Sequence, residues 1–66
     1  MRYHRRRVFV ETPNGRISAG FSAPETADAA DVSMELRQRG FKPYRLRLEP
    51  EHNAWVATVI DWQRAA

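Results

Sequence analysis

Apolar and polar residues alternate along residues 5–10, near the start of the chain. Val8 and Val10 project to one side of an extended segment, and Arg5, Arg7 and Phe9 project to the other. A period of two residues is typical of a strand with one buried face. The pattern therefore predicts a strand whose outer face carries arginines.

Asn14 and Gly15 mark a turn between this strand and a second alternating segment. Asn-Gly favours a type I′ hairpin turn, because both central residues of that turn need a positive φ. A two-residue loop at these positions predicts the register Val8 with Phe21, Val10 with Ala19 and Thr12 with Ile17. This register places the apolar residues of both strands on one face: Val8, Val10, Ile17, Ala19 and Phe21.

A helix is predicted from about residue 23 to about residue 39. Ser22 as the N-cap and Glu25 three residues later fit a capping box. Gly40 suits the left-handed residue that follows a helix, and Phe41 can then contact Leu36 as in a Schellman motif. Apolar residues recur at helical spacing and form the predicted buried stripe: Ala29, Val32 and Leu36.

Two further strands follow the predicted helix. In the first of them, Tyr44, Leu46 and Leu48 point inward and alternate with arginines. Residues 50–53 are turn formers, and a four-residue loop there pairs Leu48 with Trp55 and Leu46 with Ala57. An odd loop length would reverse the facing of the last strand, and the sequence leaves this alternative open.

The elements follow the order β-β-α-β-β in a chain of 66 residues. We therefore expect an α+β fold: a single two-layer domain spanning residues 1–66, with a four-stranded antiparallel sheet and one helix packed on one face. A right-handed split crossover gives the strand order 2-1-3-4, with the first and third strands as central neighbours. A basic N-terminal arm at about residues 1–5 and a frayed tail at about residues 63–66 complete the prediction.

Composition narrows the classes of function. The chain has no cysteine, which excludes disulfides, thiolate nucleophiles and thiolate metal ligands. Its longest apolar run, residues 54–60, is far shorter than the roughly 20 residues of a membrane-spanning helix. The N-terminal arginines are not followed by the apolar core of a secretory signal. We expect a cytoplasmic protein that makes no membrane contact.

The net charge is +3, and ten of the eleven basic residues are arginine. Arginine offers a planar fork of donors that suits phosphate and carboxylate groups. The predicted sheet gathers arginines and two aromatic residues on the face away from the helix: Tyr3, Arg5, Arg7, Phe9, Arg16, Arg45 and Arg47. Such a face favours nucleic-acid binding, with about four phosphate contacts. A merely solvated sheet face and a contact surface for an acidic protein are the alternatives.

Apolar residues near the end of the chain indicate a second contact surface. Val56, Ile60 and Trp62 fall on or near the open face, which favours a homodimer or a bound protein partner. On the predicted helix, carboxylates one and two turns apart form an acidic stripe suited to a basic partner: Asp28, Asp31 and Glu35.

The sequence carries no evident catalytic group or metal site. His4 and His52 are the two histidines, and neither belongs to a cluster with the spacing of metal ligands. The serines have no neighbouring base, and the three glycines do not form a phosphate-binding loop. We therefore expect neither an enzyme nor a cofactor, and no small-molecule substrate.

Two functions from different classes fit these features. The first is a small non-catalytic binding module that engages nucleic acid or a nucleoprotein assembly through the arginine-rich face. The second is a small interaction or inhibitor protein of phage or mobile-element type, which blocks a defence or regulatory complex by binding a protein partner. Both use the charged surfaces, so a binding experiment has to separate them.

Overall fold

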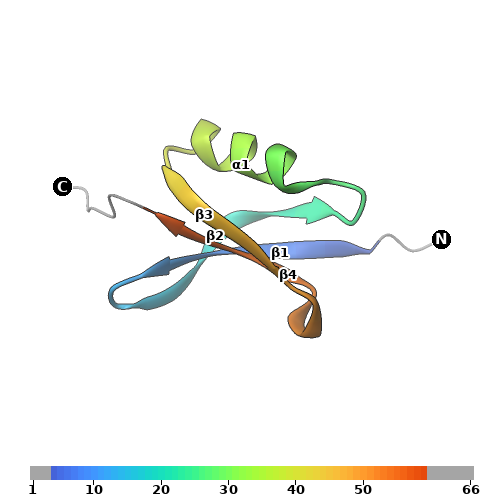
Figure 1. The fold of residues 1–66 in the computed structure, drawn as a ribbon, viewed down its shortest axis with the longest axis horizontal. Coiled ribbons are helices and arrows are strands. Elements are labelled where there is room, and N and C mark those ends of the chain that lie inside the picture. Colours follow the sequence, from blue (N-terminus) through green and yellow to red (C-terminus); the bar gives the residue numbers. More distant parts are fainter. Residues whose placement is uncertain (1–3, 60–66) are drawn as a thin grey trace.

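The computed structural model describes residues 4–59 and shows an α+β fold (Figure 1). Its elements, in chain order, are strand β1 (Arg5–Thr12), strand β2 (Gly15–Pro24), helix α1 (Ala29–Gln38), strand β3 (Pro43–Glu49), the short 3₁₀ helix η1 (Pro50–His52) and strand β4 (Ala54–Val59). The expected order β-β-α-β-β is confirmed. Predictions for Tyr3, Ile60, Trp62 and the tail at residues 63–66 lie outside the described residues, as does most of the basic arm.

The four strands form one mixed sheet in the order β2-β1-β4-β3. The hairpin pairs β1–β2 and β3–β4 are antiparallel, but β1 and β4 run parallel, with Arg7 opposite Ala54. The expected wholly antiparallel sheet with order 2-1-3-4 is therefore wrong. The connection through α1 carries the chain from one edge of the sheet to the other, and β4 then returns to fill the gap beside β1.

The turn between β1 and β2 lies one residue earlier than expected. Thr12 pairs with Gly15, so Pro13 and Asn14 form the loop. Among residues 4–59, Asn53 is the one non-glycine residue with a positive φ, which excludes the expected type I′ turn. Pro13 fixes its own φ near −65°. The Thr12 hydroxyl stabilises this turn by accepting from the Asn14 N–H at 3.1 Å and donating to the Gly15 carbonyl at 2.7 Å.

A bulge in β2 changes the register of the first hairpin. Phe9 pairs with Ser18 and Arg7 pairs with Ser22, so three residues of β2 lie opposite one residue of β1. Gly20 lies within the bulge with φ 90°, and its N–H donates to the Ser18 hydroxyl at 3.1 Å. The expected register is therefore displaced by two residues near the turn and is recovered beyond the bulge.

A second irregularity interrupts β3 between Pro43 and Arg45. Tyr44, which was expected to point inward, is 60% exposed there. Both edge strands of the sheet thus carry a distortion, and irregular edges hinder pairing with another strand. The sheet does not favour a homodimer formed by edge-to-edge strand pairing.

Helix α1 begins later than expected because β2 continues through Pro24. Pairing with β1 keeps this part of the chain extended, so Ser22 and Glu25 do not form the expected capping box. Asp28 is the N-cap instead. Its carboxylate accepts from the Asp31 N–H at 3.0 Å, and the Asp31 carboxylate accepts from the Asp28 N–H at 3.2 Å.

The C-terminal end of α1 has the predicted Schellman motif. Gly40 has φ 95°, and its N–H donates to the Arg37 carbonyl at 3.0 Å. The Phe41 N–H donates to the Leu36 carbonyl, also at 3.0 Å. These two bonds satisfy carbonyls at the end of the helix, and Phe41 packs against the hydrophobic core.

Helix and strand residues meet in one hydrophobic cluster. Its buried members are Val8, Val10, Ala19, Ala23, Val32, Leu36, Trp55 and Ala57. Leu48 pairs with Trp55 and Leu46 with Ala57, which confirms the four-residue loop and the inward facing of Trp55. Ile17, expected on the same buried face, is 40% exposed.

Candidate nucleic-acid interface

The face of the sheet turned away from the hydrophobic cluster carries most of the predicted binding residues. We call it the outer face. Strand alternation places these side chains on it: Arg5, Arg7, Phe9, Arg16, Arg45 and Arg47. Helix α1 lies on the other side of the sheet (Figure 1). The predicted facing of β1 and β3 is thus found, but the strand order separates their arginines by the width of β4.

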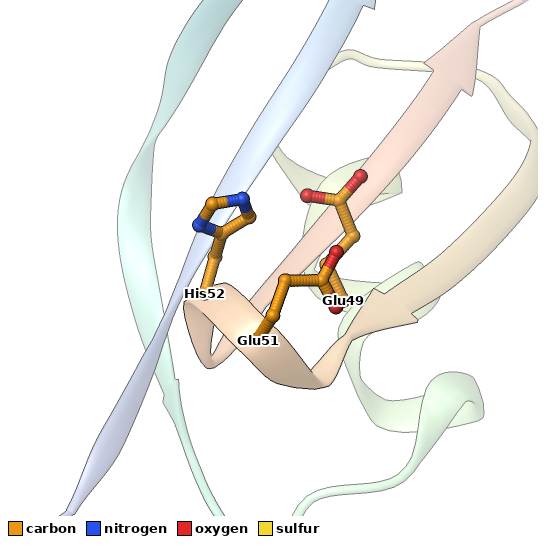
Figure 2. A group of neighbouring side chains, drawn as sticks. All are labelled: Glu49, Glu51 and His52. Atoms are coloured by element: carbon orange, nitrogen blue, oxygen red, sulfur yellow. The ribbon is translucent and has the colours of Figure 1, made fainter.

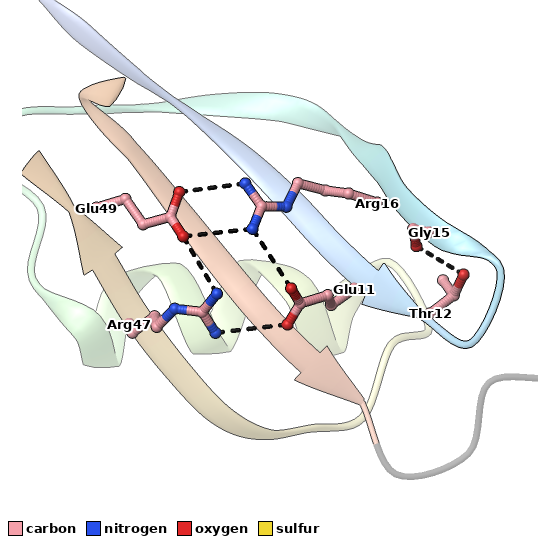
Figure 3. A network of polar contacts seen from close by, with 6 residues as sticks. All are labelled: Glu11, Thr12, Gly15, Arg16, Arg47 and Glu49. Atoms are coloured by element: carbon pink, nitrogen blue, oxygen red, sulfur yellow. Dashed lines mark hydrogen bonds and ion pairs between the residues drawn. The ribbon is translucent and has the colours of Figure 1, made fainter. Parts of the chain in front are cut away.

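Two arginines and two glutamates form a closed ring of ion pairs at the centre of the outer face (Figure 3). Arg16 binds Glu49 at 3.1 Å and Glu11 at 3.3 Å, and Arg47 binds Glu49 at 3.1 Å and Glu11 at 3.4 Å. The ring joins β1, β2 and β3 across β4. Because its formal charges cancel, the ring interrupts the arginine-rich surface predicted from the sequence.

Val56 lies beneath this ring rather than on an apolar contact surface. It is on the outer face of β4, between Phe9 of β1 and Arg47 of β3, and its exposed fraction is 0%. Long side chains on the neighbouring strands cover it, because arginine stems shield apolar surface while their charged ends stay accessible. Val56 is therefore not accessible to the protein partner or second copy expected from the sequence.

The ring shifts the titration of its carboxylates. Hydrogen bonds from Arg47 and Arg16 lower the pKa of Glu11 below its ordinary value of 4.5. Partial burial tends to raise the pKa of Glu49, whose side chain is 15% exposed, but its hydrogen bonds to Arg16 and Arg47 outweigh this effect. The pKa of Glu49 is therefore lowered as well. Both carboxylates stay charged in the folded protein at pH values where they begin to protonate in the unfolded chain.

The lowered pKa values of Glu11 and Glu49 predict that the ion-pair ring contributes to stability in a way that is lost in acid. For a carboxyl with a lowered folded-state pKa, the stabilisation is complete above the ordinary value of 4.5 and decreases as the pH falls through the folded-state pKa. Urea unfolding at neutral pH and below pH 4.5 measures the loss. The double variant Glu11→Gln/Glu49→Gln should lose less stability on acidification than the parent, and an equal loss would contradict this role of the ring.

A concave basin lies at the end of the outer face where β1 begins. Its volume is about 430 Å³. It is lined by Arg5, Arg7, Phe9, Arg16, His52, Asn53 and Ala54. These lining residues include three guanidinium groups and an imidazole but no carboxylate. The basin is thus a cationic hollow with an aromatic ring in its wall.

The arginines of the outer face differ in how many hydrogen bonds and ion pairs their guanidinium groups already make within the protein. Arg5 donates from Nε to the Ser22 hydroxyl and from Nη2 to the Ser22 carbonyl, each at 2.7 Å. The guanidinium of Arg7 makes no hydrogen bond or ion pair with residues 4–59. The guanidinium of Arg45 likewise makes no hydrogen bond or ion pair with residues 4–59. However, Arg45 lies opposite Thr58 in the strand register, at the other end of the face. Arg5 and Arg7 are therefore the basin cations without a carboxylate partner.

Asn53 and Arg6 hold the wall of the basin in place, and no local pattern in the sequence predicts this role. Asn53 adopts φ 49° after η1. Its Oδ1 accepts from Arg6 Nε at 3.1 Å, and its Nδ2 donates to the Arg5 carbonyl at 3.4 Å. Arg6 also donates to the Glu25 carbonyl at 3.0 Å. The parallel pairing of β1 with β4 brings this turn beside Arg7, and no local signal in the sequence indicates that pairing.

Glu49, Glu51 and His52 form a cluster, although the sequence predicts no set of metal-ligand residues around His52 (Figure 2). One potential metal-ligand atom from each lies within 4.8 Å of the others. However, Glu49 already binds the guanidinium groups of Arg16 and Arg47. A metal cation there would have to displace two arginines and remain beside their charge, so the cluster is poorly suited to a cation.

A groove of about 520 Å³ lies between α1 and the end of β2. Apolar side chains line part of it: Phe21, Ala23, Pro24, Ala27 and Val32. The acidic stripe of the helix borders this groove, but its carboxylates are engaged locally. Asp28 and Asp31 cap the helix, and Glu35 binds Arg39 at 3.1 Å. The Arg39 guanidinium also lies 4.7 Å from the centre of the Phe21 ring.

Comparisons with known proteins do not add a family to this description. No protein-family model, curated protein or solved structure shows significant similarity to the chain. Within residues 4–59, no helix combines the length and apolar character that a membrane crossing requires.

Proposed function

We propose that the protein is a small non-catalytic module that binds single-stranded nucleic acid through the basin on its outer face. One observation carries the proposal: the basin combines Arg5, Arg7, Arg16 and His52 with an aromatic ring, and no carboxylate lines it. In this proposal the helix and sheet form two layers, with α1 covering one face and the ligand occupying the other.

The charge of the basin supports phosphate as the ligand group. Arg7 has an unengaged guanidinium, and Arg5 is held by Ser22 through only part of its donor set. Arginine binds phosphate oxygens through paired N–H donors, which makes such contacts both strong and directional. Because Ser22 already orders Arg5, its side chain loses less conformational freedom when a ligand binds.

Phe9 supports a nucleic acid over other polyanions. Its ring lies on the outer face next to Arg7 along β1 and forms part of the basin wall. Bases stack on aromatic side chains at exposed sheet faces, with a contribution of about 1–3 kcal/mol per base. A single strand leaves its bases available for such stacking, whereas a duplex keeps them inside.

The salt dependence of binding tests the proposal. With about two phosphate contacts to a single strand, the logarithm of the binding constant falls with the logarithm of the salt concentration at a slope of about −1.4. This slope corresponds to about a sevenfold loss of affinity when the salt concentration rises from about 50 to about 200 mM. About four contacts, as the sequence alone suggested, give about −2.8 and about a 50-fold loss. Fluorescence anisotropy of a labelled oligonucleotide across this salt range measures the slope. An absence of binding at the lowest salt concentration, or binding that ignores salt, would refute the proposal.

A protein partner is the second candidate function. The groove between α1 and β2 favours it, because apolar concave surface on a small domain often marks a contact site. In this proposal the protein acts as a small inhibitor or adaptor. Capture from nuclease-treated lysate separates the two candidates: a retained protein supports this function, and loss of all retained material supports nucleic-acid binding.

A further inference from the structure

The ion-pair ring lies beside the basin on the outer face. Arg16 belongs to both, because it lines the basin and also binds the two carboxylates of the ring. Arg47, the other guanidinium of the ring, shares a cross-strand row with Phe9 of the basin wall: both residues pair with Val56, from opposite sides of β4. Neighbouring strands are about 4.8 Å apart, so this row spans about 10 Å. A nucleic-acid strand that continues from the basin across the sheet therefore meets the ring next.

The carboxylates of the ring occupy the donors that a phosphate would use. Each guanidinium binds both carboxylates, with N···O distances between 3.1 and 3.4 Å (Figure 3). Oε2 of Glu49 accepts from Arg16 at 3.3 Å and from Arg47 at 3.1 Å. Arginine presents the same planar fork of donors to a carboxylate and to a phosphate. Glu11 and Glu49 are thus internal ligands that compete with phosphate for the two guanidinium groups.

This competition favours the carboxylates. They belong to the same chain as the arginines, so their effective concentration is high, whereas an oligonucleotide has to come from solution. A phosphate that displaced Glu49 would leave a carboxylate whose side chain is only 15% exposed without its guanidinium partners. Such a charge is unfavourable without a partner, and it would also repel the phosphate. The ring therefore excludes phosphate from the centre of the outer face.

We propose that Glu11 and Glu49 mask a second phosphate-binding subsite, formed by the guanidinium groups of Arg16 and Arg47. The mask limits the phosphate contacts to those of the basin, and the two glutamates thereby set how much of a strand the protein binds. The masked subsite rests on the proposed nucleic-acid function and adds a determinant of the size of its site.

Removal of the two carboxylates tests the mask. The double variant Glu11→Gln/Glu49→Gln keeps side chains of similar size and releases both guanidinium groups. The slope of its salt dependence should steepen from about −1.4 to about −2.8, because two phosphate contacts are added. Its affinity at about 50 mM salt should rise about tenfold for each guanidinium released. Anisotropy of the labelled single-stranded oligonucleotide measures both quantities, and circular dichroism confirms that the variant is folded.

The single variant Glu11→Gln gives a graded result that does not require loss of the whole ring. Glu11 has a side chain that is 37% exposed, so its replacement disturbs the fold less than that of Glu49. One carboxylate then remains for two guanidinium groups. We expect an intermediate slope of about −2.1, because one phosphate contact is added.

Two further variants separate the subsite from a general effect of charge. Ala30→Lys/Gln38→Lys raises the net charge by as much as the double variant does, at exposed positions of α1 on the other side of the sheet. Its slope should stay near about −1.4. Addition of Arg47→Gln to the double variant should make the slope shallower by about 0.7. Equal steepening in the lysine variant, or no effect of Arg47→Gln, would overturn the assignment of the subsite.

The same titrations distinguish failure of the mask from failure of the proposed function. If the parent protein binds and both glutamine variants keep its slope and affinity, the mask is overturned and the proposed function stands. If neither the parent nor any variant binds, both are overturned. Binding by the glutamine variants alone would support the mask and overturn the proposed function of the parent protein.

Discussion

Replacement of Leu36 by alanine is expected to lower the free energy of unfolding by about 2–5 kcal/mol. Leu36 has an exposed fraction of 0% and lies in the hydrophobic cluster with residues of the sheet. Truncation removes the apolar contacts of its side chain and leaves a cavity, which the surrounding residues fill only in part. Urea unfolding monitored by circular dichroism measures the change.

The effect should be severe because a domain of this size has little stability to lose. A single hydrophobic core in a chain of 66 residues contributes about 3–5 kcal/mol of net stability, so the Leu36→Ala variant should be largely unfolded even without urea. Met34→Ala on the same helix is the matched control. Met34 is 59% exposed, and its truncation should change the free energy of unfolding by less than about 0.5 kcal/mol. Equal effects of the two substitutions would contradict the packing of α1 through Leu36.

Replacement of Arg7 by glutamine is expected to weaken oligonucleotide binding about tenfold at low salt. The guanidinium of Arg7 lines the basin and has no partner among residues 4–59, so its full donor set is open to a phosphate. Loss of one charge-assisted contact costs about 1.5 kcal/mol, which corresponds to about a tenfold change in affinity. The log–log salt slope should also become shallower by about 0.7. Anisotropy titrations at several salt concentrations measure both quantities.

The Arg37→Gln variant is the control for net charge. Arg37 is exposed in the last turn of α1, and its replacement removes one positive charge from the other side of the sheet. Its affinity and salt slope should stay within about twofold of the parent values. If the two variants weakened binding equally, only the net charge of the protein would matter, and the basin would lose its role.

The local signals of the sequence were most reliable where the residues that form a feature are neighbours along the chain. Gly40 ends α1 in the predicted Schellman motif, and the four-residue loop before β4 pairs Leu48 with Trp55 as predicted. The start of α1 shows the limit of such signals. Ser22 and Glu25 fit a capping box locally, but pairing of β2 with β1 keeps them out of the helix, and Asp28 takes the N-cap.

The candidate site depended on which strands are neighbours in the sheet, and local signals do not give this. Alternation predicted which side chains of β1 and β3 face away from the core, and Arg5, Arg7 and Arg47 do lie on the outer face. It could not predict which strands are neighbours. With β3 beside β1, the arginines would have formed one continuous patch; with β4 between them, Arg47 is neutralised in the ring.

The sequence by itself determined the order of the elements and the outward facing of the arginines of β1 and β3, because these follow from residue periodicity and composition. Only the tertiary structure decided that β4 lies parallel to β1, and with it the position of His52 and Asn53 beside Arg7. The physical reason is that strand order follows from the path of the chain around the whole core. Residues far apart in sequence must pack together before that path is chosen, and no local pattern encodes the choice.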